Sequence, residues 1–295
     1  MLNDLEPQVA AREALTSSDA ERVLACSDLV RVGVLGETAR KAHHGDRVTF
    51  VQVHPVDDPS ATAAADPGDA GEVRVSAVPT TWDAAVEMVT SAGAIAGTRP
   101  VTGFAADQLL DLAGGDLRAL VEGARRLRAA GLVAVASLPL DLVENASDVI
   151  KALQDAGVAC WRAVIDRAET LDTRLAMITR AVQVQRDTQA FKALAPLPVH
   201  DAIETPSTGY DDVRTIAVAR LVATSIPSIQ VDWRIYGPKL AQVAIAYGAD
   251  DIDAVPATDA VGLGPRRSPR EDMERQIRAA FASPAVRSGR FELIG

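Results

Sequence analysis

Short apolar runs alternate with amphipathic segments along most of the chain. Leu132–Leu138 is a nearly continuous apolar run, which predicts a strand that is buried on both faces. Asp116–Ala130, just before it, has apolar positions at helical spacing and is followed by Gly131, a residue type that commonly ends a helix. Helices and strands that alternate in this way are typical of parallel β-α units.

The same pattern recurs on both sides of this pair. Further strands are predicted at Val48–His54, Val73–Val78, Ile95–Val101, Val158–Ile165, Phe191–Leu197 and Ile229–Trp233. Further helices are predicted at Trp82–Ala92, Ala105–Ala113, Ala146–Ala156, Leu171–Thr188, Asp211–Ala223 and Pro238–Tyr247. After the first strand, Asp57–Gly71 is rich in Ala, Asp, Pro and Gly, and it is predicted to be a mobile loop because it has few apolar side chains to bury.

The alternation predicts a single α/β barrel. A chain of 295 residues is within the range of one such barrel. We expect a helical lead-in over residues 1–47, the barrel over 48–255 and a C-terminal extension over 256–295. In the extension, Arg270–Phe281 is predicted to be a charged helix, and Arg290–Ile294 a last strand or a docked extension.

Composition narrows the classes of function. Of all residues 48% are apolar, so a sizeable core can be buried. The formal net charge of −10 argues against a nucleic-acid backbone or an anionic membrane surface as the main partner. The two cysteines are far apart, which favours a reducing compartment over a disulfide framework. The N-terminus has no signal-peptide pattern and no apolar run reaches transmembrane length, so we expect a cytoplasmic protein.

A long ordered series of motifs lies between Pro206 and Val255. Thr208–Leu221 reads TG-x-DD-x-RTIAVARL, Gly237–Ala244 reads G-x-KLAQVA, and Gly248–Asp253 reads GADDID. The series resembles that of two radical SAM enzymes of the futalosine route to menaquinone, aminofutalosine synthase and cyclic dehypoxanthinyl futalosine synthase, and of their cousins, the FO synthases. The resemblance implies an α/β fold, a partial or distorted (β/α) barrel of the radical SAM type, with helical additions at both ends.

The cluster motif of that family is missing from its expected place. In the family a Cys-x3-Cys-x2-Cys loop should follow Val53, but here the chain continues with the letters HPV and then with the loop Asp57–Gly71, which holds no cysteine. Cys26 and Cys160 are the only thiols of the sequence, and two thiolates cannot complete the cysteine set of an iron–sulfur cluster. We therefore expect no [4Fe–4S] cluster and no radical SAM activity.

Two further family positions differ as well. The glycine pair after the family's second strand, which approaches the amino group of SAM, is replaced by Ala77–Thr80 (AVPT). The Gly-Thr pair that follows the final GADDID is replaced by Ala254-Val255. These changes argue against SAM binding, and no cofactor is expected.

Two histidines follow predicted strands. His54 closes Val48–His54, and His200 follows Phe191–Leu197 with carboxylates close by in the sequence. The C-terminal ends of barrel strands form the mouth at which active sites lie. Each histidine could be a general base there, or a metal ligand together with carboxylates, or a plain loop residue. Nothing in their spacing demands a metal, so no metal site is predicted.

Carboxylates of the last predicted strands form a second group of candidates. Asp251 and Asp253 would share one face of a strand, because side chains alternate along it. Two carboxylates on one face could bind a ribose hydroxyl pair, a cation or an arginine. The structural alternative is a salt bridge to Arg214 or Arg220.

A third pair of polar residues flanks a tryptophan. Asp232 and Arg234 lie on either side of Trp233, and they could form a strand-end ion pair or contact a ligand. No catalytic residue is identified. The candidate ligand-binding residues are His54, His200, Asp232, Arg234, Asp251 and Asp253.

The sequence leaves three functions open. The first, which is favoured, is a non-catalytic helper of menaquinone synthesis that holds a small-molecule ligand or pairs with a protein partner or a second copy. The second is an enzyme repurposed to radical-free chemistry on an aromatic or nucleoside-like compound. The third is a conventional family member whose cluster is held by a route that the sequence does not show. The first two differ at the mouth, where an enzyme needs titratable groups within hydrogen-bond reach.

Overall fold

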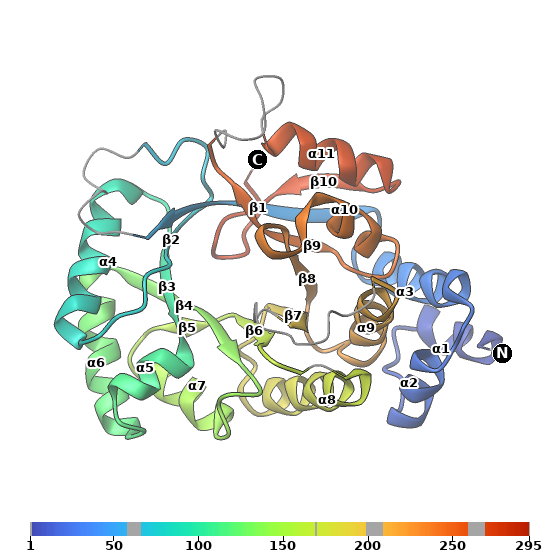
Figure 1. Ribbon diagram of the computed structural model, residues 1–295, viewed down its shortest axis with the longest axis horizontal. Helices are drawn as coiled ribbons and strands as arrows, with labels where there is room; N and C mark the ends of the chain where they lie inside the picture. Colours follow the sequence, from blue (N-terminus) through green and yellow to red (C-terminus); the bar gives the residue numbers. More distant parts are fainter. Residues whose placement is uncertain (1, 58–65, 169, 199–208, 259–268, 295) are drawn as a thin grey trace.

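Parallel strands form a closed barrel in the computed structural model, which describes residues 2–57, 66–168, 170–198, 209–258 and 269–294 (Figure 1). In order around the barrel the strands are β1 (Arg47–Val56), β2 (Glu72–Val75), β3 (Val101–Ala105), β4 (Leu132–Pro139), β6 (Arg162–Ile165), β7 (Ala193–Pro198), β8 (Ser228–Asp232) and β9 (Asp251–Pro256). The short β5 (Ala159–Cys160) also pairs with β4, so β5 and β6 occupy one strand position that is interrupted at Trp161. Pairing of β9 with β1 closes the ring.

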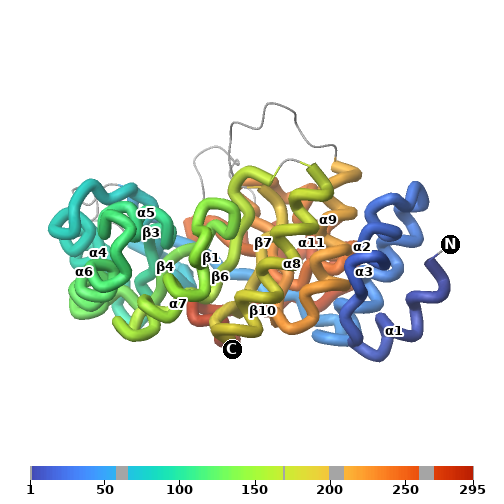
Figure 2. The backbone as a smooth tube through the Cα atoms, turned by 90° about the horizontal axis from the view of Figure 1, so that it is seen from below, coloured from blue at the N-terminus to red at the C-terminus, as the bar shows by residue number. Residues whose placement is uncertain are grey.

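Helices surround this barrel, and others extend it at one side (Figures 1 and 2). Those that follow the barrel strands are α4 (Trp82–Ala96), α5 (Ala106–Leu112), α6 (Leu117–Ala130), α7 (Ala146–Asp155), α8 (Leu171–Thr188), α9 (Gly209–Val222) and α10 (Trp233–Ile245). The N-terminal elements are η1 (Asn3–Leu5), α1 (Glu6–Ala10), α2 (Ser17–Leu24) and α3 (Leu29–His44), and α2 and α3 pack against α9. None of the described helices is long and apolar enough to span a membrane.

Local sequence signals explain where most elements begin and end. Asp116 accepts hydrogen bonds from the backbone N–H groups of Arg118 and Ala119 and so caps α6, while Gly131 ends it with a φ of 115°. The strand that follows is buried along most of its length, as its continuous apolar run predicts. The predicted α/β barrel with helical additions at both ends is confirmed.

Two predicted boundaries are wrong. The expected strand Ile95–Val101 begins inside α4, which continues to Ala96, and the strand runs from Val101 to Ala105. A short apolar run is compatible with either a helix or a strand, and the positive φ of 60° at Gly97 marks the true turn. The helix expected from Pro238 begins earlier, at Trp233, because Asp232 caps a first turn before a kink at Gly237. Residues 58–65 of the predicted mobile loop lie outside the described residues.

The barrel is distorted beside β1. One edge of β1 pairs with β9, whereas the other edge pairs with β10 (Ser283–Val286) over Arg47–Phe50 and with β2 only from Val53 onward. Strand β10 follows α11 (Pro269–Ala279) and so separates the N-terminal end of β1 from β2. Beyond β10 the chain turns back, and the backbone N–H of Ile294 donates to the carbonyl of Val286. The predicted last strand is thus a docked extension, and the strand β10 before it was not predicted.

Candidate functional site

A cavity of about 780 Å³ lies at the C-terminal ends of four neighbouring strand positions. We call it the mouth cavity. The residues that line it come from β1, β2, β8 and β9 and from the segments that follow β2 and β8: Val53, Pro55, Arg74, Ser76, Asp232, Arg234, Ile235, Ala254 and Pro256. Barrel enzymes place their active sites at this end.

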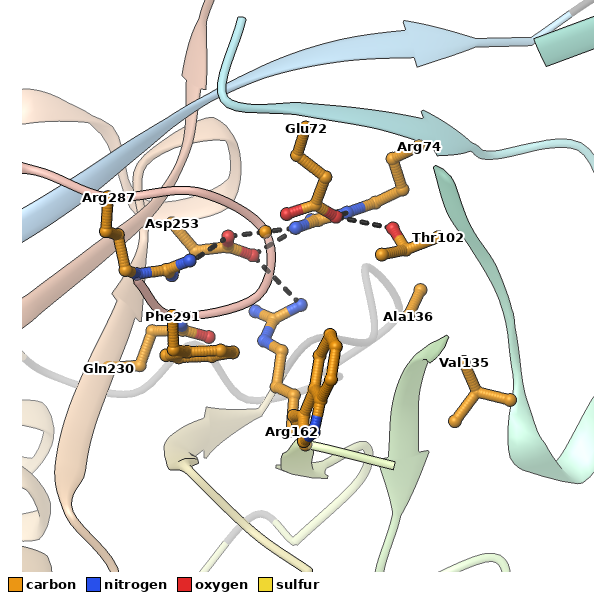
Figure 3. Close-up of a pocket in the computed structure, with 12 residues that line it drawn as sticks. Glu72, Arg74, Thr102, Val135, Ala136, Arg162, Gln230, Asp253, Arg287 and Phe291 are labelled. Carbon is orange, nitrogen blue, oxygen red and sulfur yellow. Dashed lines mark hydrogen bonds and ion pairs between the residues drawn. The ribbon is translucent and has the colours of Figure 1, made fainter. Parts of the chain in front are cut away.

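Arg74 lines the mouth cavity and pairs with Asp253, and we call this pair the floor of the cavity. Figure 3 shows the two side chains. The guanidinium donates two hydrogen bonds of 2.9 Å to the two Asp253 oxygens, and its Nε donates to Glu72 Oε1 at 2.7 Å. Burial opposes the charge on Arg74, but Asp253 and Glu72 outweigh it and raise the pKa of the guanidinium. The floor is therefore a closed network of ion pairs around Arg74.

Arg162 extends this network across the lumen. Its Nη1 lies 3.2 Å from Asp253 Oδ2, and its Nη2 donates to Asp232 Oδ2 at 3.2 Å. Burial by itself would raise the pKa of Asp253, but Arg74 and Arg162 hold that pKa well below its usual range. Asp253 is thus a permanent anion held between arginines of β2 and β6.

The C-terminal segment supplies a third buried arginine. Arg287 donates to Asp251 through Nε at 2.6 Å and through Nη2 at 2.7 Å, and its guanidinium stacks on the ring of Phe291 at 4.0 Å. Asp251 also accepts from Gln230 at 2.6 Å. The side chain of Arg287 is almost fully buried, so a residue outside the barrel strands completes the lumen.

The two carboxylates of β9 lie on one face of the strand, as the alternation of side chains predicts. Asp251 and Asp253 both face the lumen, where their partners are the arginines of β2, β6 and the C-terminal segment. The alternative partners suggested by the sequence pair elsewhere, Arg214 with Asp211 and Arg220 with Asp250.

Asp232 and Arg234 do not form the strand-end ion pair that their spacing suggested. Asp232 pairs with Arg162 and accepts from the backbone N–H groups of Arg234 and Ile235, so it caps α10. The Arg234 guanidinium has no hydrogen bond or ion pair within the residues that the structure describes, although the residue lines the mouth cavity. Arg234 is thus a cation available to a ligand.

Of the two candidate histidines the structure describes His54, and His54 does not line the mouth cavity. His54 is half-buried on β1, and its neighbours Val53 and Pro55 line the mouth cavity, so alternation directs His54 to the other face of the strand. His200 lies outside the described residues.

Sequence reasoning missed the three arginines of the lumen. Arg74 in β2 and Arg162 in β6 each interrupt a run of apolar strand residues, and a buried charge in such a place needs a partner. An arginine within an apolar run was therefore the signal in the sequence that indicated a buried ion pair. Arg287 had none, because the segment that carries it shows no strand pattern.

The thiols do not fit an iron–sulfur cluster. Cys160 lies in β5, where burial raises the pKa of its thiol to about 12, and Cys26 lies beyond α2 with its Sγ near the Asp28 carbonyl. A cluster needs several thiolates at one place. Within the described ranges, no group of three or more His, Cys, Asp and Glu side chains is placed to hold a metal ion.

Comparisons with known proteins give distant relatives that share part of the chain. No family model matches. The chain is 30% identical over 142 residues to the aminodeoxyfutalosine synthase of Streptomyces coelicolor, a match that covers 41% of this chain and 37% of that enzyme. It is 28% identical over 196 residues to the cyclic dehypoxanthine futalosine synthase of the same organism, covering 58% and 49%. It is also 30% identical over 159 residues to a 5-amino-6-(D-ribitylamino)uracil–L-tyrosine 4-hydroxyphenyl transferase of Methanosarcina barkeri, covering 48% and 41%.

Solved structures extend the likeness to the whole barrel. Methylornithine synthase (PylB) has a TM-score of 0.67 at 13% identity, with 95% of this chain and 97% of that chain covered. HydG, a maturase of the [FeFe]-hydrogenase, has a TM-score of 0.68 at 14% identity, with 96% and 75% covered. At such identities these likenesses show the fold alone. Together with the sequence matches, which span less than half of each relative's length, they make the chain a divergent relative of the radical SAM enzymes that its motifs resemble.

Proposed function

We propose that this chain is a cluster-free relative of the radical SAM enzymes of menaquinone synthesis, which binds a small molecule at the mouth of its barrel and assists that pathway without catalysing radical chemistry. The observation that carries the proposal is the thiol inventory. The 295 residues contain two cysteines, one of them buried in a strand and the other beyond an outer helix. No cluster can be assembled from that donor set.

The polar groups of the mouth cavity favour binding over catalysis. Among the described residues that line it, the ionisable ones are Arg74, Asp232 and Arg234. Arg74 and Asp232 are each held by several partners, so both serve to fix the structure around the cavity. A general acid or base needs a pKa near the working pH and access to the reacting atom. A repurposed enzyme is therefore the less favoured function.

The lining also indicates the kind of ligand. Apolar side chains form much of the wall: Val53, Pro55, Ile235, Ala254 and Pro256. The Arg234 guanidinium and the Ser76 hydroxyl provide polar contacts at the same cavity. A compound with a flat apolar body and one polar or anionic group, such as a nucleoside or a substituted benzoate, matches this mixture. The helper role also includes a protein partner, either an active enzyme of the pathway or a second copy of this chain.

Anaerobic reconstitution with iron and sulfide tests the absence of a cluster. We expect no stoichiometric visible absorbance and no SAM cleavage, because the thiolates are too few. A reconstituted protein with about four irons per chain that cleaves SAM would overturn the proposal.

Calorimetric titration with nucleosides and benzoates tests the binding site. Arg234→Ala should weaken the binding of an anionic ligand by about 1–3 kcal/mol, because the partner of a charged group is lost. The matched control is Arg126→Ala, which removes an exposed arginine from α6 and should leave binding unchanged. Equal losses in both variants, or no binding by the unmodified protein, would remove the mouth cavity as the site.

A further inference from the structure

A second, smaller cavity lies deeper in the lumen than the mouth cavity (Figure 3). We call it the inner cavity. Its volume is about 20 Å³, and Arg74 lines it as well as the mouth cavity, so the Arg74–Asp253 pair separates the two. Trp161 and Phe291 supply aromatic walls. A space of this size holds one water molecule and nothing larger.

Two buried polar atoms of the residues around the inner cavity have no hydrogen-bond partner in the part of the chain that the structure describes. They are Arg162 Nε, a donor, and Gln230 Oε1, an acceptor. The orientation of Gln230 is fixed, because its Nε2 donates to Asp251 and its oxygen must therefore be the other end of the amide. Each terminal nitrogen of Arg162 contacts a carboxylate, Asp232 or Asp253, so Nε is the guanidinium nitrogen that has no partner among the described residues.

We propose that the inner cavity is a binding site for a single water molecule, which accepts a hydrogen bond from Arg162 Nε and donates one to Gln230 Oε1. Buried polar groups in proteins are almost always satisfied, and ordered water is the usual partner where protein groups do not reach. The site discriminates by chemistry. A halide would accept a hydrogen bond from Arg162, but the Gln230 oxygen and the Asp253 carboxylate would repel it. A metal ion or ammonium would be repelled by the Arg162 guanidinium.

The water would hold Arg162 in its bridging position. With Nε–H bound on one side, the two terminal nitrogens stay directed at Asp253 and Asp232, which come from different strands. The water thereby supports the ion-pair network that includes Asp253 and Asp232.

A crystal structure of the full chain, at a resolution that shows ordered waters, tests the site. We expect one peak at about 2.7–3.2 Å from both Arg162 Nε and Gln230 Oε1. An inner cavity without density between well-ordered side chains, or a peak that reaches only one of the two atoms, would overturn the proposal. An anomalous peak at this position in a bromide-soaked crystal would assign the site to a halide and would also overturn it.

Nuclear magnetic resonance provides a second measurement in solution. The Arg162 Nε–H should show a nuclear Overhauser effect to a long-lived water, and Gln230→Leu should abolish it by removing the acceptor. If Gln230→Leu does not fold, the effect in the unmodified protein decides alone, because its absence contradicts a resident water. Gln183→Leu, at an exposed position on α8, should leave the signal unchanged.

Discussion

Arg74 and Asp253 face one another across the barrel lumen from β2 and β9, joined by two hydrogen bonds of 2.9 Å each. On the surface, a single nitrogen of Arg22, Nη2, lies 2.9 Å from each of the two oxygens of Asp4. The two pairs differ in exposure, because the Asp253 side chain is 1% exposed and that of Asp4 is 58% exposed. This difference in burial should be the main determinant of what each pair contributes to stability.

Arg74→Met should reduce the free energy of unfolding by about 3–5 kcal/mol, because it leaves Glu72 and Asp253 buried with fewer cations around them. The matched variant Arg22→Met should leave the free energy of unfolding nearly unchanged, since water solvates Asp4 once its partner is gone. Denaturant unfolding of both variants measures the difference. Equal effects at the two sites would contradict the role assigned to burial.

The stability of the protein should fall in acid through Asp253. Its folded pKa is held well below the usual range, whereas an unfolded aspartate titrates at about pH 3.9. Below that pH the unfolded chain binds a proton at Asp253 that the folded chain does not bind. The contribution of Asp253 to the free energy of unfolding is therefore present above about pH 4 and declines as the pH falls.

Asp253→Asn provides the comparison for this acid effect. The variant should be less stable than the unmodified protein at neutral pH, and the gap between their free energies of unfolding should narrow below about pH 4. Urea unfolding at a series of pH values follows the gap. Curves that stay parallel through the acid range would show that another group carries the effect.

Ala254 has a backbone conformation that glycine tolerates better. Its φ is 56° within β9, in the left-handed region that disfavours a side chain, and the family that the motifs resemble has a glycine at this place. Ala254→Gly should raise the free energy of unfolding by about 1 kcal/mol. Ala94→Gly, at an exposed position inside α4, should lower it by about 1 kcal/mol. Thermal unfolding compares the two variants. A loss of stability in both would show that the backbone at Ala254 is not strained.

Two helical glycines should respond in opposite ways to an added methyl group. A Cβ on Gly123 of α6 would lie 2.4 Å from the ring of Trp82, which belongs to α4. Gly123→Ala should therefore lower the free energy of unfolding by about 1–3 kcal/mol. At Gly93 of α4 the nearest atom would be 3.9 Å away, so Gly93→Ala should raise it by about 0.5–1 kcal/mol. Destabilisation by both changes would mean that the α4–α6 contact does not explain the effect.

The fold was largely predictable because its elements are local. Apolar strand runs, the Asp116 cap and Gly131 are readable within a few residues of the sequence. Strand β10 was missed because Ser283–Val286 is short and contains a proline, so no apolar alternation distinguishes it. Its place is decided by pairing with β1, which lies more than two hundred residues earlier in the chain.

The candidate site was predictable only in part. Alternation placed Asp251 and Asp253 on one face, but their partners come from β2, β6 and the C-terminal segment. Such contacts across a barrel depend on strand register, which a single sequence does not reveal.

The motifs that carried the resemblance most strongly contribute to the site through Asp251 and Asp253, but they also form a structural joint. Arg220, from the RTIAVARL motif, is fully buried and pairs with Asp250 from GADDID. His44 lies 3.3 Å from the other oxygen of the same carboxylate. These residues connect α3, α9 and β9 at the end of the barrel opposite the mouth. The strong motif match therefore reported partly on the scaffold.

The position of Arg287 in the chain has a consequence for synthesis on the ribosome. Asp251 is translated 36 residues before the arginine that neutralises it. At ordinary elongation rates this leaves roughly 2 to 7 s in which a nascent chain carries Asp251 but lacks the arginine that pairs with it. The barrel therefore acquires its final form only after the docked extension has emerged, and a translational pause within that interval would prolong its exposure to chaperones and proteases.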